Sequence, residues 1–160
     1  MGAETEGRPV PYEEAVASMF EKLGPCKIMA VGACAGGRVT VRNVSGIFRE
    51  GRIFFKTDVN FPKTRQLLEN PKTAICVGGV QVEGDAVNLG KVTDEPGRVF
   101  ERLYKEYWDK SYTAYPHTET EILMEVVPSF AEIWDQDENF KGFQTFIDFE
   151  RKEAAVKYYD

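Results

Sequence analysis

Histidine and cysteine are scarce in this chain of 160 residues. His117 is the only histidine, and we expect it at the surface because it lies in the polar segment YPHTET. Protein zinc sites take three or four Cys, His or carboxylate ligands, so a single imidazole argues against a metalloenzyme. The cysteines Cys26, Cys34 and Cys76 are odd in number, form no C-x-x-C pair and lie in apolar runs. We therefore expect buried free thiols in a reducing compartment and no resident metal.

The sequence also lacks long apolar runs, an N-terminal segment that resembles a signal peptide, and an excess of basic residues. No stretch approaches the roughly 20 apolar residues of a membrane span, and residues 1–11 lack the apolar run of a signal peptide. The net charge of −6 argues against a nucleic-acid partner. No G-x-G-x-x-G motif is present to bind a dinucleotide. These absences predict a cytoplasmic protein without a membrane or nucleic-acid partner.

What is present is a globular composition, with 42% hydrophobic and 29% charged residues. A chain of this length can bury a substantial core as one unit. We expect a single domain over residues 1–160, with a flexible tail at 1–9 and a C-terminal extension at 136–160.

Hydrophobic periodicity and turn residues predict an alternation of strands and helices. An apolar stripe and Gly24 predict a helix over 11–23, Pro62 opens a second helix that Asn70-Pro71 ends, and Asp94 and Pro96 begin a third. Residues 108–120 read as a loop, and residues 150–160 fit either a helix or a strand. Strands are expected at 26–35, 38–48, 52–57, 73–78, 80–92, 122–127, 130–134 (separated from the preceding one by Pro128) and 143–149. This pattern predicts an α+β barrel of six to seven antiparallel strands with interposed helices.

The segment from Ile53 to Pro71 is the strongest candidate for a binding site. A strand that ends at Thr57 leads through a polar turn to a helix whose first turn carries Lys63, Thr64 and Arg65. Positive charge, hydroxyls and the N-terminal end of a helix together favour a phosphate monoester. The alternative is an ordinary amphipathic connector, with Leu67 and Leu68 on the core and the basic residues in water.

Four blocks of sequence resemble the pyridoxamine 5′-phosphate oxidase-like family of FMN-binding split β-barrels, especially its small flavin-binding, nitroimidazole-resistance-protein-like members. The blocks are the first helix and strand to Ala35, RVTVRNVSGIFREGRIFFKT, the run from Thr57 through Lys63 to the L-x-x-N-P at 67–71, and VEGDA at 82–86. The resemblance implies a split barrel that binds FMN at a homodimer interface. The implied cofactor-binding residues are Arg42, Asn43, Val44, Ser45, Lys56, Thr57, Lys63, Thr64 and Gln81.

The resemblance also implies a role for each group of residues. Residues 42–45 would follow the edge of the flavin ring, Lys56 and Thr57 would lie at the ribityl chain and phosphate, and Lys63 would pair with the phosphate. The partner subunit would add contacts from Trp134 or from residues 108–117. The fuller oxidase has Ser-Arg-Lys where this chain has Phe61-Pro62-Lys63, and its C-terminal Arg and His motif has no match after Trp134.

Simpler readings of the same residues stay open at this stage. Arg42 fits a solvated strand arginine, Lys56 a cross-strand ion pair, Gln81 an exposed strand residue and Trp134 a core or interface residue. The favoured function is an FMN-dependent oxidoreductase with an unknown substrate and no assigned catalytic residue, with a nicotinamide nucleotide as a possible electron donor. The alternatives are a flavin-binding or storage module without turnover and a haem-binding split barrel, which would need His117, a cysteine or a methionine as axial ligand.

Overall fold

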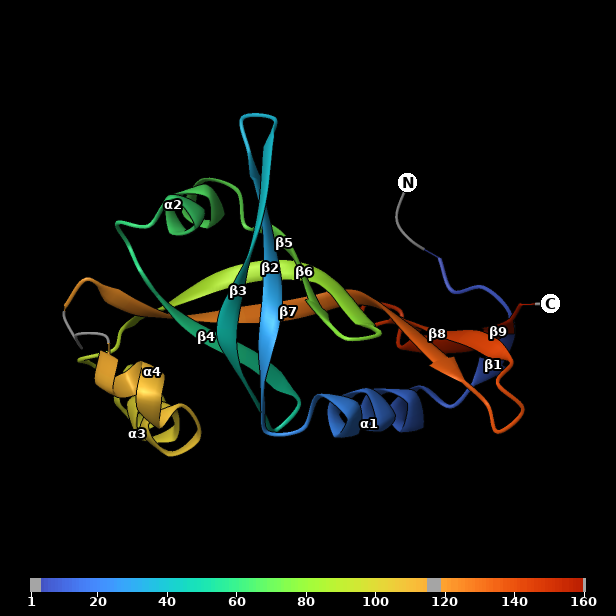
Figure 1. The fold of residues 1–160 in the computed structure, drawn as a ribbon. Helices are drawn as coiled ribbons and strands as arrows, with labels where there is room; N and C mark the ends of the chain where they lie inside the picture. The colour runs from blue at the N-terminus through green and yellow to red at the C-terminus, as the bar shows by residue number, and fades with distance from the viewer. Residues whose placement is uncertain (1–3, 115–118, 160) are drawn as a thin grey trace.

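A closed antiparallel barrel forms the centre of the molecule, which we describe from a computed structural model covering residues 4–114 and 119–159. Figure 1 shows the barrel with α1 below it, α2 above β4, and the α3–α4 pair at one end. The elements are β1 (Arg8–Val10), α1 (Tyr12–Leu23), β2 (Cys26–Ala35), β3 (Arg38–Arg49), β4 (Arg52–Asp58), α2 (Pro62–Glu69), β5 (Lys72–Val77), β6 (Val80–Lys91), α3 (Gly97–Tyr107), α4 (Asp109–Ala114), β7 (Glu121–Gln136), β8 (Gly142–Asp148) and β9 (Glu153–Tyr158).

Six strands close the barrel in the order β7-β4-β3-β2-β5-β6, because β6 also pairs with β7. The predicted α+β split barrel is therefore confirmed. The split lies between β3 and β4, which pair only where Ile47–Arg49 meet Arg52–Phe54. Beyond that point β3 follows β2 into the long hairpin that projects from the barrel in Figure 1, and β4 follows β7. This divergence opens the space in which the candidate site lies.

The barrel interior is filled by the inward-facing residues of these strands. Met29, Ile53 and Phe55 are fully buried there. Helix α1 covers one side through Met19 and Leu23, and Leu67 joins α2 to the same core. Leu68 is half exposed, so only one of the two leucines expected on the core is buried. Burial of these aliphatic and aromatic side chains makes the main favourable contribution to the free energy of folding.

The chain between 121 and 136 is one long strand rather than the two strands expected on either side of Pro128. The β6–β7 register shifts at this point: Glu83 pairs with Phe130 and Gly84 with Pro128. Proline is tolerated at such a bulge because no ladder hydrogen bond is required of it. A side chain on Gly84 would lie 2.2 Å from the Val127 carbonyl oxygen, so glycine permits the close approach of the two strands.

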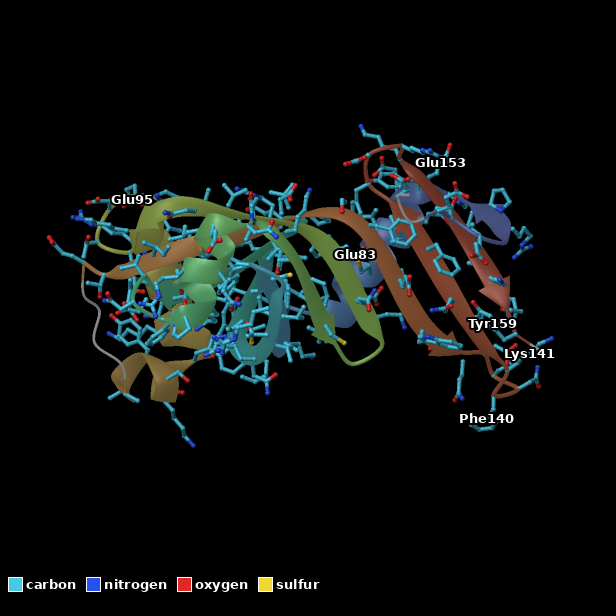
Figure 2. All side chains as sticks on the ribbon, turned by 90° about the horizontal axis from the view of Figure 1, so that it is seen from above. Glu83, Glu95, Phe140, Lys141, Glu153 and Tyr159 are labelled. Atoms are coloured by element: carbon cyan, nitrogen blue, oxygen red, sulfur yellow. The ribbon has the colours of Figure 1, made fainter. Side chains whose placement is uncertain are left out.

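Three further strands, β1, β8 and β9, extend the sheet beyond the six-stranded barrel, so that the described residues form a nine-stranded sheet. Strand β8 confirms the expected strand at 143–149, and residues 153–158 form a strand rather than a helix. Arg8 and Pro9, which were expected in a flexible tail, belong to β1 and pair with Val156 and Ala155 of β9. Figure 2 shows this extension, marked by Glu153, Tyr159 and Phe140, on the opposite side of the molecule from α2.

The segment expected as a loop at 108–120 includes helix α4, and α3 begins at Gly97 rather than after a capping Asp94. Pro96 is the N-cap residue of α3, and no side-chain cap is present. His117 lies outside the described residues, so its expected surface position is untested. No helix in the described ranges has the length and apolar character needed to cross a membrane.

Candidate functional site

A cavity of about 420 Å³ lies where β3 and β4 diverge, between the first turn of α2 and the α3–α4 pair. Its size falls within the usual range for small-molecule sites. The lining residues are Ile28, Asn43, Val44, Ser45, Lys56, Thr57, Asp58, Phe61, Lys63, Tyr104, Ser111, Tyr112 and Glu121.

Six of the nine predicted cofactor-binding residues line this cavity. They are Asn43, Val44, Ser45, Lys56, Thr57 and Lys63. Arg42 is exposed next to them on β3, and its charge acts on Lys63. Thr64 is fully buried beneath the cavity wall. Gln81 is exposed on β6 and does not line the cavity of its own chain.

Lys63 is a buried ammonium that faces the cavity from the first turn of α2. It is only 7% exposed, and its Nζ lies 4.5 Å from the centre of the Phe61 ring. Within residues 4–114 and 119–159, no hydrogen bond or ion pair is made by this Nζ. Burial, followed by the nearby charge of Arg42, lowers the pKa of Lys63 from 10.5 to about 8, although Asp58 acts in the opposite direction. An anion in the cavity would supply the direct ion-pair partner that this ammonium lacks among the described residues.

The backbone at the start of α2 offers less to an anion than the sequence indicated. Pro62 has no N–H, and the N–H groups of Thr64 and Arg65 both donate to the Phe61 carbonyl oxygen. Of the donors in this first turn, the side chain and the backbone N–H of Lys63 are the ones that these bonds leave to an anion.

The two threonines expected at the phosphate bond to each other. The hydroxyls of Thr57 on β4 and Thr64 on α2 lie 2.8 Å apart, and both residues are buried. This contact fixes the first turn of α2 to the end of β4 and so orients Lys63. Only Thr57 also faces the cavity.

Lys56 is held in an ion cluster rather than left available to a phosphate. Its Nζ lies 3.0 Å from Glu101 Oε1 on α3 and 3.3 Å from Glu121 Oε2 on β7. The same Nζ lies 5.4 Å and 5.6 Å from the ring centres of Tyr104 and Tyr112. The ion-pair reading of Lys56 is therefore the one that the structure supports, although the partners come from a helix as well as from a strand. We call Lys56, Glu101 and Glu121 the ion cluster.

Tyr104 closes the gap between the diverging strands and was not predicted as a site residue. Its buried hydroxyl accepts the Lys56 N–H at 2.7 Å and donates to the Ser45 carbonyl oxygen at 3.0 Å. Burial raises the pKa of this phenol far above its ordinary value, so the hydroxyl remains a donor. The phenol thus connects β3 to β4 where the two strands no longer pair directly.

Replacement of Tyr104 by Phe should destabilise the fold by about 2–3 kcal/mol. The change removes one atom but leaves the Ser45 carbonyl and the Lys56 N–H without this partner in a buried place. The exposed Tyr107 on the same helix provides the matched control, and Tyr107→Phe should change stability by less than about 0.5 kcal/mol. Urea unfolding of the two variants measures the difference, and equal stabilities would contradict the bridging role of Tyr104.

Asp58 is a second lining residue that the sequence did not identify. Its carboxylate accepts hydrogen bonds from the Asn60 N–H at 2.8 Å and from the Thr120 hydroxyl at 2.7 Å. These bonds, led by that of the Asn60 N–H, lower the pKa of Asp58. The carboxylate is thus committed to the turn that precedes α2, and it offsets part of the positive charge at Lys63.

Trp134 lies outside this cavity, on the outer face of the extended sheet. It is 52% exposed and stacks on Tyr159, with the ring centres 5.2 Å apart. Gln81 is directly opposite Glu132 in the β6–β7 ladder, and Trp134 lies two residues further along, so all three share one face. Neither Gln81 nor Trp134 reaches the cavity within one subunit.

Comparison with solved structures defines the fold class. PhzG from Burkholderia lata, solved in complex with tetrahydrophenazine-1-carboxylic acid, is 13% identical, with a TM-score of 0.62 over 92% of this chain and 89% of that one. A NimC/NimA family protein from Clostridium acetobutylicum is 17% identical, with a TM-score of 0.56 over 93% and 96% of the two chains. A pyridoxamine 5′-phosphate oxidase-related, FMN-binding protein from Nostoc punctiforme is 14% identical, with a TM-score of 0.58 over 94% and 97%.

The chain therefore has the split-barrel fold of pyridoxamine 5′-phosphate oxidase-like proteins, as the resemblance in sequence predicted. At this level of identity the likeness establishes the fold alone. No family model and none of the curated proteins compared matches the sequence.

Proposed function

We propose that the protein binds FMN in the cavity between β3 and β4 and that Lys63 pairs with the phosphate. The observation that carries this proposal is the buried ammonium of Lys63, which faces the cavity without an ion-pair or hydrogen-bond partner among the described residues. The FMN-binding relative from Nostoc punctiforme shares the fold, which supports the choice of ligand. Asn43, Val44 and Ser45 line the same cavity, and polar groups of this strand would offer hydrogen bonds to the ring edge.

The functional unit in this proposal is a homodimer whose two subunits share each flavin site. Asn43, Ala30, Cys76 and Gln81 lie opposite one another in a single row across β3, β2, β5 and β6. With a strand spacing of about 4.8 Å, Gln81 lies roughly 14 Å from Asn43 on the same face. A two-fold axis through the small residues in between would bring the partner's Gln81 beside the cavity, with the partner's Trp134 on the same face.

Exposed apolar side chains support an interface on this face. Val39 and Val41 on the projecting β2–β3 hairpin are 76% and 69% exposed, and Ile28 at the edge of the cavity is half exposed. They alternate along their strands on the face that also carries Asn43. Several exposed apolar side chains on one face are typical of a protein–protein contact.

The proposed activity is that of an oxidoreductase in which bound FMN supplies the redox chemistry. The chain itself would hold the phosphate through Lys63, orient the ring against β3, and limit access of water to the cavity. The three cysteines are free, as expected, but they are not buried: Cys26 and Cys34 are partly exposed and Cys76 is exposed. A binding or storage role without turnover uses the same site, and reduction by NAD(P)H with reoxidation by oxygen would distinguish the enzyme from the passive binder.

The visible spectrum of the purified protein, with its mass in solution, tests this proposal. We expect flavin absorbance and a dimer by sedimentation. A Soret band would favour the haem alternative instead, but the described cavity lining contains no histidine, cysteine or methionine to ligate the iron. Flavin bound to a monomer would contradict the shared site, and failure to bind added FMN would overturn the proposal.

FMN affinity should fall as the pH rises from 7 to 9. Lys63 has a pKa of about 8 in the free protein, and a bound phosphate dianion would raise it. Below pH 8 the ammonium is present before binding; above pH 8 the protein must take up a proton to bind, so affinity should drop by up to about tenfold per pH unit. The phosphate stays dianionic over this range. Fluorescence titrations should show this slope for FMN and no comparable slope for riboflavin, and parallel pH profiles would contradict the pairing.

A further inference from the structure

The ion cluster is a charged element that FMN binding by itself does not use. Its three members come from β4, α3 and β7, and each side chain is largely buried. Lys56 and Glu121 line the cavity. Glu101 does not line it, but it accepts a hydrogen bond from Lys56 Nζ. Two carboxylates and one ammonium are thus concentrated in the wall of a cavity proposed to hold a redox cofactor.

In the proposed binding mode, the flavin ring would lie next to the ion cluster. A phosphate on Lys63 leaves the ring to extend along Asn43–Ser45, toward the part lined by Tyr104, Tyr112 and Glu121. The Tyr104 hydroxyl joins the Ser45 carbonyl to the Lys56 backbone N–H, so Ser45 and the strand that carries Lys56 are held in a fixed relation to each other.

Resting on the proposed function, we propose that the ion cluster sets the electron affinity of the bound flavin. Reduction by two electrons and one proton leaves one added negative charge on the ring. Carboxylates in the same water-poor wall disfavour that charge and an ammonium favours it, because Coulomb interactions are stronger there than in water. Glu101 and Glu121 therefore lower the reduction potential of the flavin, and Lys56 raises it.

The reduction potential of the FMN-loaded protein, measured by spectroelectrochemical titration with dithionite as the electron source, tests this inference. Glu101→Gln removes a negative charge but keeps an oxygen to accept the hydrogen bond from Lys56. It should favour the reduced state at least tenfold, which corresponds to about 30 mV for a two-electron couple. Glu121→Gln should shift the potential in the same direction, and it replaces Glu101→Gln as the test variant if Glu101→Gln does not fold.

Glu106 provides the matched control, since it lies on the same helix as Glu101 but is exposed. Glu106→Gln removes the same charge and should leave the potential at the wild-type value. FMN that binds all variants with one common potential would overturn the inference and leave the proposed function intact. Wild-type protein that fails to bind FMN would overturn both.

Discussion

Replacing Lys63 by Met should make the protein more stable and a poorer FMN binder at the same time. Loss of a charge-assisted hydrogen bond to the phosphate should weaken FMN binding by about 1.5–3 kcal/mol, or roughly 10- to 150-fold. The free energy of unfolding, in contrast, should rise, because burial of the Lys63 ammonium destabilises the fold. A pKa of about 8 in place of 10.5 means that keeping Lys63 protonated at neutral pH costs at most about 3 kcal/mol, and solvent in the open cavity reduces this cost.

The pH dependence of stability provides a separate check on this prediction. The unfolded chain keeps the Lys63 proton up to about pH 10.5, whereas the folded protein releases it near pH 8. The unfolded state therefore binds more protons between these values, so the contribution of Lys63 to stability rises over this interval. The advantage of Lys63→Met should be complete below pH 8 and should shrink toward pH 10.

Urea unfolding and FMN titration of one preparation measure both effects. Arg65 is the matched control because it lies in the same helical turn but is exposed. Arg65→Met should leave stability and FMN affinity within about 0.5 kcal/mol of the wild type. A Lys63→Met protein that loses stability but keeps its FMN affinity would contradict the assigned role.

Replacing Lys56 by Met should change stability in the opposite direction from Lys63→Met, with a large decrease in the free energy of unfolding. The change removes the ammonium that contacts Glu101 and Glu121 and leaves two largely buried carboxylates facing each other. Breaking a buried ion pair from one side typically costs 3–5 kcal/mol. We therefore expect a loss of about 3–5 kcal/mol, visible in urea unfolding at neutral pH.

Two companion variants make this prediction specific. The triple change Lys56→Met, Glu101→Gln and Glu121→Gln should recover most of the lost stability because no charge then remains in the cluster. Lys72 forms an exposed ion pair with Asp85, so Lys72→Met should cost less than about 1 kcal/mol. Lys63→Met is expected to weaken FMN binding. If Lys56→Met had the same effect and caused no loss of stability, the result would contradict this prediction and identify Lys56 as a phosphate ligand.

The barrel was predictable from sequence where local signals determine the structure. Gly36-Gly37 and Glu50-Gly51 turn the chain through positive φ angles, and alternating apolar residues define β2, β3 and β4 between them. Pro128 was misread because its tolerance depends on a bulge in the pairing with Gly84 of another strand. Residues 153–158 form a strand because β8 and β1 pair with them. The sequence of this segment alone does not reveal these two partners.

Local sequence signals revealed the part of the candidate site whose residues are close in sequence, and the family resemblance added Asn43, Val44 and Ser45 of β3. Thr57 and Lys63 belong to one strand–turn–helix segment, and both face the cavity. The partners of Lys56, in contrast, are 45 and 65 residues away, so its ion cluster depends on how α3 and β7 pack against β4. Tyr104 had the pattern of a core residue in an amphipathic helix, and its hydroxyl gains a role only because β3 and β4 separate at that point.

Comparison of FMN with riboflavin in calorimetric titrations tests the central claim most directly, because the two ligands differ only in the phosphate. At pH 7 we expect FMN to bind at least tenfold more tightly than riboflavin. That difference should disappear in Lys63→Met and persist in Arg65→Met. Equal affinities of the wild-type protein for the two ligands would contradict an FMN site whose phosphate is held by Lys63.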